Sequence, residues 1–310
     1  MTDILNVYDH PVRDYLRTYL KQSGHNPNEF EPIIAAAFEQ AKKTTPDEFR
    51  DYDSAVLLGH MKFKSKGYLQ AVLTQEDKWK DCRESVKAFY SVFLIGAGLS
   101  YDSDMPLVGT LHHVLEFCEA TGWAELRSDP KKCLKFKQTF KQICKDKSPS
   151  AAHSLLIDSY PNIIWEIICL NWDDLLEKAA SMSSKVINKC NKDISVLGER
   201  YLWKFHGDVG EIRDGNIVGQ GGWVFPDEQG YVFNCFRDYI KRTGLDQRMF
   251  TFVIVGYSET ESKIYDQIVS FFELNPKRPT FRIGLDLRNL NEKYYIVGTA
   301  EFTMRKVLPN

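Results

Sequence analysis

Apolar positions along the chain follow two different spacings, and the change between them falls near residue 87. Before that point, apolar residues recur three or four positions apart, as in residues 11–21 and 31–43. This spacing places apolar side chains on one stripe of a helix. The pattern therefore predicts a helical cap region over residues 1–86.

After residue 87, apolar runs of strand length alternate with longer stretches of helical spacing. The runs occupy residues 90–95, 163–169, 250–255 and 281–285. Strands that are apolar on both faces are typical of a parallel sheet covered by helices on each side. The sequence predicts an α/β fold with a Rossmann-like parallel sheet over residues 87–310, in addition to the N-terminal helical cap.

Composition limits the classes of partner. The 310 residues include 43% apolar and 13% aromatic residues, enough for a substantial core. The net charge of -2 provides no general attraction to nucleic acid or to an anionic membrane. Residues 131–147 are rich in lysine at helical spacing, and we interpret them as a solvated amphipathic helix, with nucleic acid or a partner chain as the alternative. Direct nucleic-acid binding is not expected.

The sequence also bears on location and metal content. No apolar run approaches the roughly 18 to 20 residues of a membrane helix, and the first residues are too polar for a secretory signal, so we expect a cytoplasmic protein without membrane contact. The seven cysteines are dispersed, odd in number and never spaced as CxxC. They are interpreted as reduced thiols, and no metal site is expected.

The first candidate ligand-binding segment follows the apolar run at 90–95. It comprises Gly96, Ala97, Gly98 and Ser100, and residues 107–121 after it have helical spacing. Glycines in a turn from strand to helix allow backbone N–H groups to approach a pyrophosphate. Such turns also occur for packing reasons, and the full GxGxxG pattern is absent. Both interpretations stay open for this segment alone.

A second candidate segment follows the run at 163–169. There Asn171 and Asp173 precede a predicted helix, at the strand end where an open α/β sheet places ligand-binding groups. The alternative is that Asp173 or Asp174 only caps that helix.

The third candidate is His206, which with Gly207 ends a strand-like run. Histidine exchanges a proton near neutral pH, so His206 is a candidate general base. A hydrogen-bonded structural histidine is the alternative. Of the seven histidines only His206 directly follows a predicted core strand, whereas the others lie in predicted helices or polar loops.

Later strand ends carry small or acidic residues suited to the ribose and adenine end of a dinucleotide. An acidic residue at such a position often binds ribose hydroxyls, and ordinary turns would give the same pattern. The residues are Gly256, Ser258, Asp286 and Thr299.

In this order, the segments resemble the sirtuin family over about residues 88–308. Gly96 to Ser100 match its GAGxS motif, Asn171 and Asp173 match its TxNxD strand end with Cys169 in place of threonine, and His206-Gly207 match its catalytic His-Gly pair. Gly256 and Ser258 match a GxS strand end.

Departures from the deacylating sirtuins favour another activity. The Ser-Gly-Ile-Pro of that group becomes Ser-Asp-Met-Pro at residues 103–106, and Asp286 replaces the usual asparagine. Four zinc-binding cysteines are missing, since only Cys235 lies between Gly207 and Gly256, whereas structural zinc needs about four ligands. The remaining motifs resemble the sirtuin-like NAD hydrolases of bacterial anti-phage defence, whose Asn-x-Asp-x-Leu-Leu-Glu matches residues 171–177.

The resemblance implies an NAD hydrolase with NAD⁺ as substrate and no metal, whose role is NAD depletion in anti-phage defence. In it Asn171 would orient the ribose and water, Asp173 would bind the carboxamide, and His206 would act as base. It also implies a homo-oligomer, with a HerA-type ATPase as a possible partner of the kind found with some members of the family. The alternatives are a protein deacylase, an ADP-ribosyltransferase, a non-catalytic NAD or ADP-ribose sensor, and a structural α/β domain.

Overall fold

A parallel sheet forms the centre of the computed structural model, which describes residues 4–45, 54–105, 111–185, 187–190, 201–209, 212–213, 216–217, 231–245, 248, 250–257, 268 and 280–308. Within these residues the sheet has seven strands, and all neighbours are parallel. Their order is β3 (Asn188–Cys190), β4 (Tyr201–Lys204), β2 (Ile164–Cys169), β1 (Tyr90–Ile95), β7 (Phe250–Val255), β8 (Thr280–Gly284) and β9 (Tyr295–Val297). The predicted Rossmann-like fold is confirmed.

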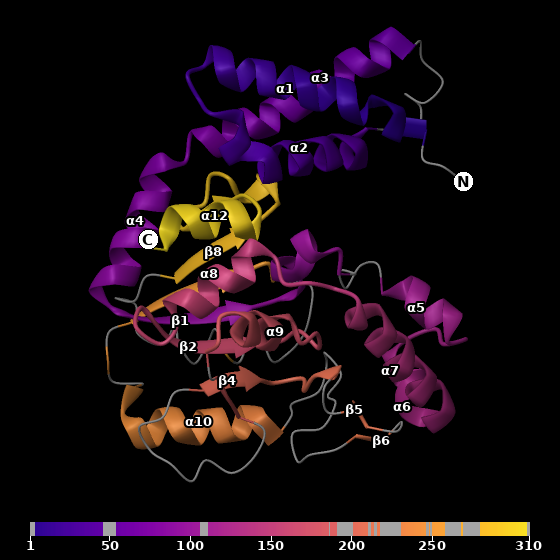
Figure 1. The fold of residues 1–310 in the computed structure, drawn as a ribbon, viewed down its shortest axis with the longest axis vertical. Helices are drawn as coiled ribbons and strands as arrows, with labels where there is room; N and C mark the ends of the chain where they lie inside the picture. Colours follow the sequence, from indigo (N-terminus) through magenta and orange to yellow (C-terminus); the bar gives the residue numbers. More distant parts are fainter. Residues whose placement is uncertain are drawn as a thin grey trace.

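Alternate side chains of the central strands enter two different cores. In β1, Phe93 and Ile95 face one core, whereas Val92 and Leu94 face the other. Helices α8 (Ala151–Ser159), α9 (Leu175–Met182) and α12 (Ala300–Val307) contribute to the first core, and α10 (Tyr231–Thr243) covers the second (Figure 1). Because each face is covered, the central strands are mostly apolar, which explains the apolar runs in the sequence.

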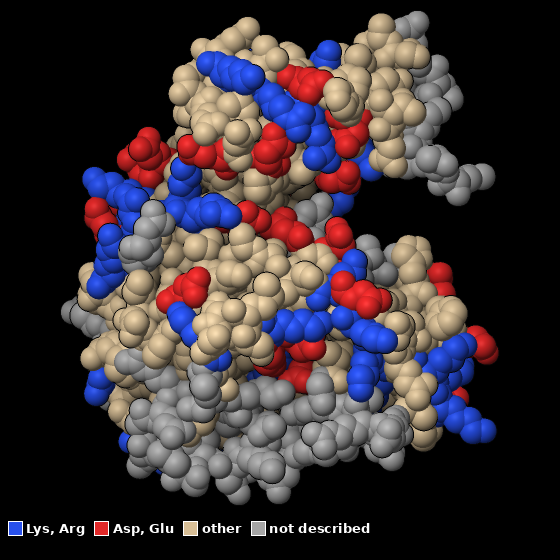
Figure 2. Space-filling model, in the orientation of Figure 1, with Lys and Arg blue, Asp and Glu red and all other residues tan. Residues whose placement is uncertain are grey.

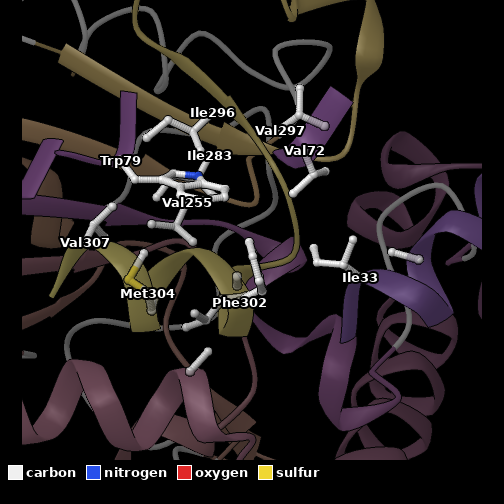
Figure 3. Packing of buried hydrophobic residues seen from close by; sticks show 14 of the residues in the cluster. Ile33, Val72, Trp79, Val255, Ile283, Ile296, Val297, Phe302, Met304 and Val307 are labelled. Carbon is white, nitrogen blue, oxygen red and sulfur yellow. The ribbon is translucent and has the colours of Figure 1, made fainter. Parts of the chain in front are cut away.

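The N-terminal helices are continuous with the first core. They are η1 (Ile4–Tyr8), α1 (Asp9–Gln22), η2 (Pro27–Phe30), α2 (Glu31–Thr44), α3 (Ser54–Leu73) and α4 (Glu76–Ala88), and α1 to α3 lie beyond α12 in Figure 1. Figure 3 shows Ile33 and Trp79 from these helices packed with Phe302 of α12 and Ile283 of β8. The Trp79 and Phe302 ring centroids are 5.4 Å apart. An N-terminal helical region is thus confirmed, and it covers one edge of the sheet.

Two polar side chains attach this region to β9. Gln75, which is 2% exposed, donates from Nε2 to the Val297 carbonyl at 3.0 Å and accepts the Val297 N–H at 2.7 Å. Lys78 Nζ donates to the carbonyls of Leu290, Glu292 and Tyr295 at 2.6 to 2.9 Å. The helical region therefore satisfies backbone groups that an edge strand leaves open.

A separate helical module lies beside the carboxyl edge of the sheet. It consists of α5 (His112–Phe117), α6 (Trp123–Ser128) and α7 (Pro130–Lys145), which share a third apolar core (Figure 1). Asp129 caps α7 by accepting from Lys131 N and Lys132 N, and Pro130 occupies its first turn. The predicted lysine-rich helix is α7, although Lys137 is buried rather than solvated.

The remaining described elements are short. Strands β5 (Ile212–Arg213) and β6 (Asn216–Ile217) form an antiparallel pair, and η4 (Ala97–Ser103) and η8 (Leu287–Asn289) follow β1 and β8. On the face drawn in Figure 2, acidic and basic side chains are interspersed. No helix in the described part of the chain is both long and apolar enough to span a bilayer.

Candidate functional site

The glycine turn after β1 packs against the turn after β7. Gly98 N donates to the Gly256 carbonyl at 2.7 Å, and Gly96 N donates to the Val255 carbonyl at 2.9 Å. A Cβ atom on Gly98 would lie 2.5 Å from Gly256 Cα, and Gly256 has a φ of +64°. These glycines therefore permit the contact between two turns, as the packing interpretation of the sequence proposed.

That contact also limits which N–H groups can meet a ligand. The N–H groups of Gly96, Gly98 and Leu99 all donate to protein carbonyls, the last to Gly96 O at 3.0 Å. Ala97 begins η4 and is partly exposed. A phosphate at this turn would therefore not meet the N–H groups of Gly96, Gly98 and Leu99.

Three predicted site residues form one hydrogen-bonded cluster. Ser100 Oγ donates to Asp173 Oδ2 at 2.8 Å, and Asn171 Nδ2 donates to Ser100 Oγ at 3.2 Å and to the Gly96 carbonyl at 3.1 Å. The exposed fractions of Ser100, Asn171 and Asp173 are 1%, 8% and 5%. The structure thus joins the loop after β2 to the glycine turn after β1.

Asn171 has a fixed amide orientation in this cluster. The Gly96 carbonyl can only accept, so the atom facing it must be the amide nitrogen. Both contacts described for the side chain use Nδ2, and none in the described part of the chain uses Oδ1. The group that Asn171 can offer a ligand is therefore an acceptor.

Asp173 has a structural function in the same cluster. Its Oδ1 accepts from Leu175 N at 3.2 Å, at the start of α9, while Oδ2 accepts from Ser100. As the capping interpretation predicted, this carboxylate accepts an N–H at the start of α9, and it also connects α9 to Ser100. A contact between Asp173 and a ligand stays a prediction.

Trp172, between these two polar residues, points into the third core. Its ring centroid lies 5.7 Å from Trp123, 5.9 Å from Phe136 and 5.6 Å from Phe140. The apolar face of α7 therefore anchors the loop that carries Asn171. The helical spacing of residues 131–147 predicts that face but does not predict its partner.

His206 lies in the adjacent loop, at the end of β4, and is 4% exposed. Phe205 N donates to the Cys169 carbonyl at 3.2 Å, and Val209 N donates to the Trp172 carbonyl at 2.9 Å. These bonds hold the loop carrying His206 beside the loop carrying Asn171. Gly207, with a φ of +71°, provides the left-handed turn that follows the histidine.

Lys204 is a buried charge behind this site that sequence patterns did not identify. It is 1% exposed, and its Nζ donates to the Asp173 carbonyl at 2.5 Å and lies 3.8 Å from Glu177. Burial lowers the pKa of Lys204, but the acidic side chains of Glu177, Asp208 and Asp173 raise it. The ammonium group therefore stays charged and holds the backbone of the Asn171 loop.

Cys169 contributes a neutral thiol next to this lysine. Burial raises the pKa of Cys169 to about 12, and Lys204 Nζ is 3.7 Å from its sulfur.

Among the described residues no group of three or more histidine, cysteine or acidic side chains could hold a metal ion.

His153 is a site neighbour that the sequence pattern placed on a helix and did not select. It lies on α8 with 0% exposure, and its Nε2 is 3.3 Å from Ser100 Oγ. The available signal was the Ser-x-x-His at residues 150–153, where the two side chains form a capping box.

The residues predicted for the adenosine end lie on local turns. Asp286 accepts from Arg288 N at 2.9 Å and pairs with the Arg288 guanidinium at 2.5 Å, which lowers the Asp286 pKa. Thr299, 3% exposed, caps α12 by accepting from Phe302 N. Ser258 lies outside the described residues. Ligand contacts by these three residues stay predictions.

The fold and the polar groups at its carboxyl edge define a Rossmann-like α/β protein with a buried hydrogen-bonded cluster. No protein-family model and no curated protein matches the sequence. Solved structures do match it. One, described as the structural basis for the mechanism and regulation of Sir2 enzymes, has a TM-score of 0.53 and 16% identity, covering 75% of this chain and 97% of that chain.

Two complexes give similar values. A Sir2 homologue with NAD has a TM-score of 0.51 and 16% identity, covering 74% of this chain and 92% of that chain. A mutant Sir2 homologue with ADP-ribose has a TM-score of 0.52 and 16% identity, covering 74% and 94%. The chain therefore has a sirtuin-like, Sir2-type fold.

Proposed function

We propose that this chain is an NAD hydrolase that releases nicotinamide and ADP-ribose from NAD⁺. The observation that carries the proposal is the cluster of Ser100, Asn171 and Asp173 at the carboxyl edge of the parallel sheet. Ligands of open α/β sheets bind at this edge. Further support comes from the Sir2-type fold, because a solved Sir2 homologue with a similar fold is in complex with NAD.

Asn171 orients the reacting groups in this proposal. Its two N–H groups hold Gly96 and Ser100, so Oδ1 accepts a hydrogen bond from a ribose hydroxyl or from the attacking water. An amide fixed in advance holds the reactants without the entropic cost of ordering it during the reaction.

Nicotinamide can leave without a proton from a general acid, whereas the attacking water must give a proton to a base. The C1′–N bond breaks, and its electron pair neutralises the pyridinium ring, so nicotinamide leaves as a neutral molecule. The transition state is oxocarbenium-like, as in other glycosyl transfers. The water oxygen bonds to C1′ and its proton passes to His206, an assistance typically worth about 10² to 10⁴ in rate.

The pyrophosphate and the adenosine of the substrate would lie along the carboxyl ends of the strands. The pyrophosphate would lie at the start of η4, near the partly exposed Ala97, and the adenosine ribose would approach Asp286. Asp173 accepts from Ser100 and Leu175, so its contacts favour a positioning function. A direct contact with the carboxamide of nicotinamide stays a prediction.

Incubating the purified chain with NAD⁺ and separating the products by chromatography tests the activity. We expect nicotinamide and ADP-ribose to form in equal amounts when no acylated peptide is added. Products that form only with an acetyl-lysine peptide would instead indicate a deacylase. Label from NAD⁺ on protein would indicate an ADP-ribosyltransferase, and saturable binding without turnover would indicate a sensor.

Substitutions test the two predicted catalytic residues. Asn171→Ala and His206→Ala should each reduce kcat for nicotinamide release by about 10² or more, since each removes a contact with the reacting groups. The matched controls are Asn162→Ala and His113→Ala, at exposed positions before β2 and on α5. Parent-like turnover by either site variant would contradict its assignment.

The cellular function follows from the resemblance of residues 171–177 to defence NAD hydrolases. We propose that the chain depletes NAD in anti-phage defence, as a cytoplasmic homo-oligomer that pairs with a HerA-type ATPase. Measuring NAD in infected cells with the parent chain or the His206→Ala variant tests the role. A monomer in chromatography with light scattering would contradict the oligomer, and failure to co-purify with a co-expressed HerA-type ATPase would contradict that partner.

A further inference from the structure

Lys204 and Cys169 are paired neighbours in the sheet, two positions before the residues assigned to the reaction. Cys169 of β2 is the partner of Lys204 of β4 in their parallel pairing. Asn171 and His206 follow two positions later along the chain. Trp203 faces the second core, so Lys204 faces the opposite side of the sheet, as Cys169 does. The Lys204 side chain therefore starts directly before the two loops that carry the proposed reacting groups.

The ammonium group of Lys204 connects three elements that meet behind the site. Its Nζ donates to the Asp173 carbonyl, in the loop after β2, at 2.5 Å. It also lies 3.8 Å from Glu177 Oε1 on α9 and 3.7 Å from Cys169 Sγ. Since Lys204 belongs to β4, one side chain holds β4, the loop of Asn171 and the first turn of α9 together.

Stability alone does not account for a charge at this position. Lys204 is 1% exposed, and Asp208, in the loop after β4, is 2% exposed. Burial lowers the pKa of Lys204, whereas Glu177 and Asp208 are among the acidic groups that raise it. We call these three side chains the charge cluster. Replacing such buried ionic groups by apolar residues is often neutral or stabilising, so the ammonium group calls for a functional explanation.

The charge cluster also accounts for two motif residues that the reaction leaves unused. Glu177 ends the segment 171–177, and Asp208 ends the segment 206–208. Each of these segments carries one of the proposed reacting residues. Because both acids attract the ammonium group of Lys204, the charge cluster draws the two segments toward each other.

We propose that Lys204 is a positioning residue, which holds the loops of Asn171 and His206 at the separation that the reaction requires. This inference rests on the proposed NAD hydrolase function. The bond to the Asp173 carbonyl fixes the first loop, and the pairing of β4 with β2 fixes the second. A displacement of about 1 Å between reacting groups can lower a rate about a hundredfold, so a residue that touches neither substrate nor reacting atoms can still determine kcat.

Two variants separate the hydrogen bond of Lys204 from its charge. Lys204→Met keeps an unbranched side chain but loses the donor to the Asp173 carbonyl and leaves the acids without their cation. Adding Glu177→Gln removes one acidic charge and restores the balance, but it does not restore the donor. Lys78→Met is the matched control, because it removes an ammonium group that donates to backbone carbonyls at β9 instead of at the site.

We expect Lys204→Met to lower kcat about tenfold or more, with KM changed less than about threefold. The double variant should recover melting temperature relative to Lys204→Met, while its kcat stays about tenfold or more below that of the parent. Lys78→Met should lower the melting temperature and keep kcat within about twofold. If Lys204→Met does not fold, the double variant is compared with the parent directly. Recovery of kcat together with melting temperature, or a parent-like kcat in Lys204→Met, would overturn the proposal.

Amide hydrogen exchange distinguishes failure of this inference from failure of the proposed function. Leu175 N and Val209 N donate to Asp173 Oδ1 and to the Trp172 carbonyl, so both amides report on the two loops. Both should exchange about tenfold or more faster in the double variant than in the parent, but not in Lys78→Met. If the parent releases no nicotinamide, the hydrolase proposal fails, and faster exchange would still support the holding of the loops by Lys204. Unchanged exchange at both amides would overturn it.

Discussion

Individual buried polar residues determine the geometry at the sheet edge. Asn171, Ser100 and Asp173 are each less than a tenth exposed, and every contact among them pairs a donor with an acceptor. Buried polar groups without partners are costly, so such a cluster tends to adopt one arrangement. The same low exposure makes the cluster sensitive to single substitutions.

The contact between Gly98 and Gly256 predicts that a side chain at position 98 lowers the free energy of unfolding. Gly98→Ala would place a methyl group against the Gly256 backbone, 2.5 Å from its Cα, and should lower the free energy of unfolding by about 1–3 kcal/mol. Gly59→Ala on α3 is the control, because no atom lies within 4 Å of the added Cβ. It should raise stability by about 0.5–1 kcal/mol. Urea unfolding of both variants measures the difference, and a neutral Gly98→Ala would contradict the contact.

His153 should make stability depend on pH in mildly acidic solution. Burial lowers the pKa of His153 from 6.5 to about 4. The Asp173 carboxylate opposes this shift, and the Lys204 ammonium group adds to it. As pH falls below 6.5 the unfolded chain takes up a proton before the folded chain does. The free energy of unfolding therefore decreases between about pH 6.5 and pH 4, by about 3 kcal/mol.

Comparison with His153→Gln isolates this contribution. Burial raises the pKa of Asp102 to about 6, so Asp102 stabilises the folded chain as pH falls and opposes His153. Asp102 is present in both proteins, and its effect cancels in the difference. Urea unfolding at pH 7 and at pH 4.5 should show a smaller loss for His153→Gln. Equal losses would show that His153 does not titrate as its burial implies.

At the scale of elements, helices outside the sheet fix the loops at its edge. The α5–α7 module holds Trp172, α8 carries His153, and the turn between α3 and α4 carries Gln75. None of these contacts joins neighbours in sequence. The strands supply the frame, and distant helices set the conformation of the loops that follow them.

Gln75→Glu tests the attachment of the helical region to β9. The substituted carboxylate keeps an acceptor for Val297 N but loses the donor to the Val297 carbonyl. An unsatisfied buried carbonyl next to a charge should cost about 1–3 kcal/mol in the free energy of unfolding. Gln142→Glu, at an exposed position of α7, should change the free energy of unfolding by less than about 0.5 kcal/mol. Similar unfolding midpoints for the two variants in urea would contradict the attachment.

Sequence patterns predicted the positions of the strands more accurately than the contacts between side chains. The runs at 90–95 and 250–255 coincide with β1 and β7, because strands buried on both faces leave an unambiguous signal. The motif order also placed Asn171 and Ser100 at one edge. Lys204 and His153 were missed, since their significance depends on neighbours that lie 31 and 53 residues away along the chain.

For the whole molecule, one apolar core joins the N-terminal helices, α12 and the sheet. Trp79, Phe302 and Ile283 belong to the same cluster (Figure 3). The sequence suggested a division at residue 86, and the packing crosses that position. The helical region is therefore part of what stabilises the sheet, whatever else it does.

Removing residues 1–86 should prevent stable folding. The shortened chain would expose the apolar side of α12 and the groups of β9 that Gln75 and Lys78 satisfy. We expect aggregation or loss of a cooperative transition, measured by light scattering and thermal circular dichroism. Cooperative unfolding of the shortened chain at the parent temperature would instead support an independent domain over residues 87–310.

The polar attachment at β9 also restricts how copies of this chain can assemble. In this strand the Val297 N–H and carbonyl and the Tyr295 carbonyl are taken by Gln75 and Lys78. The Tyr295 N–H donates to the Glu292 carbonyl at 3.3 Å, so an incoming strand would find these backbone groups of β9 already bonded. Growth of a continuous intermolecular sheet is therefore blocked at that side, and subunits would have to join through surfaces other than this edge.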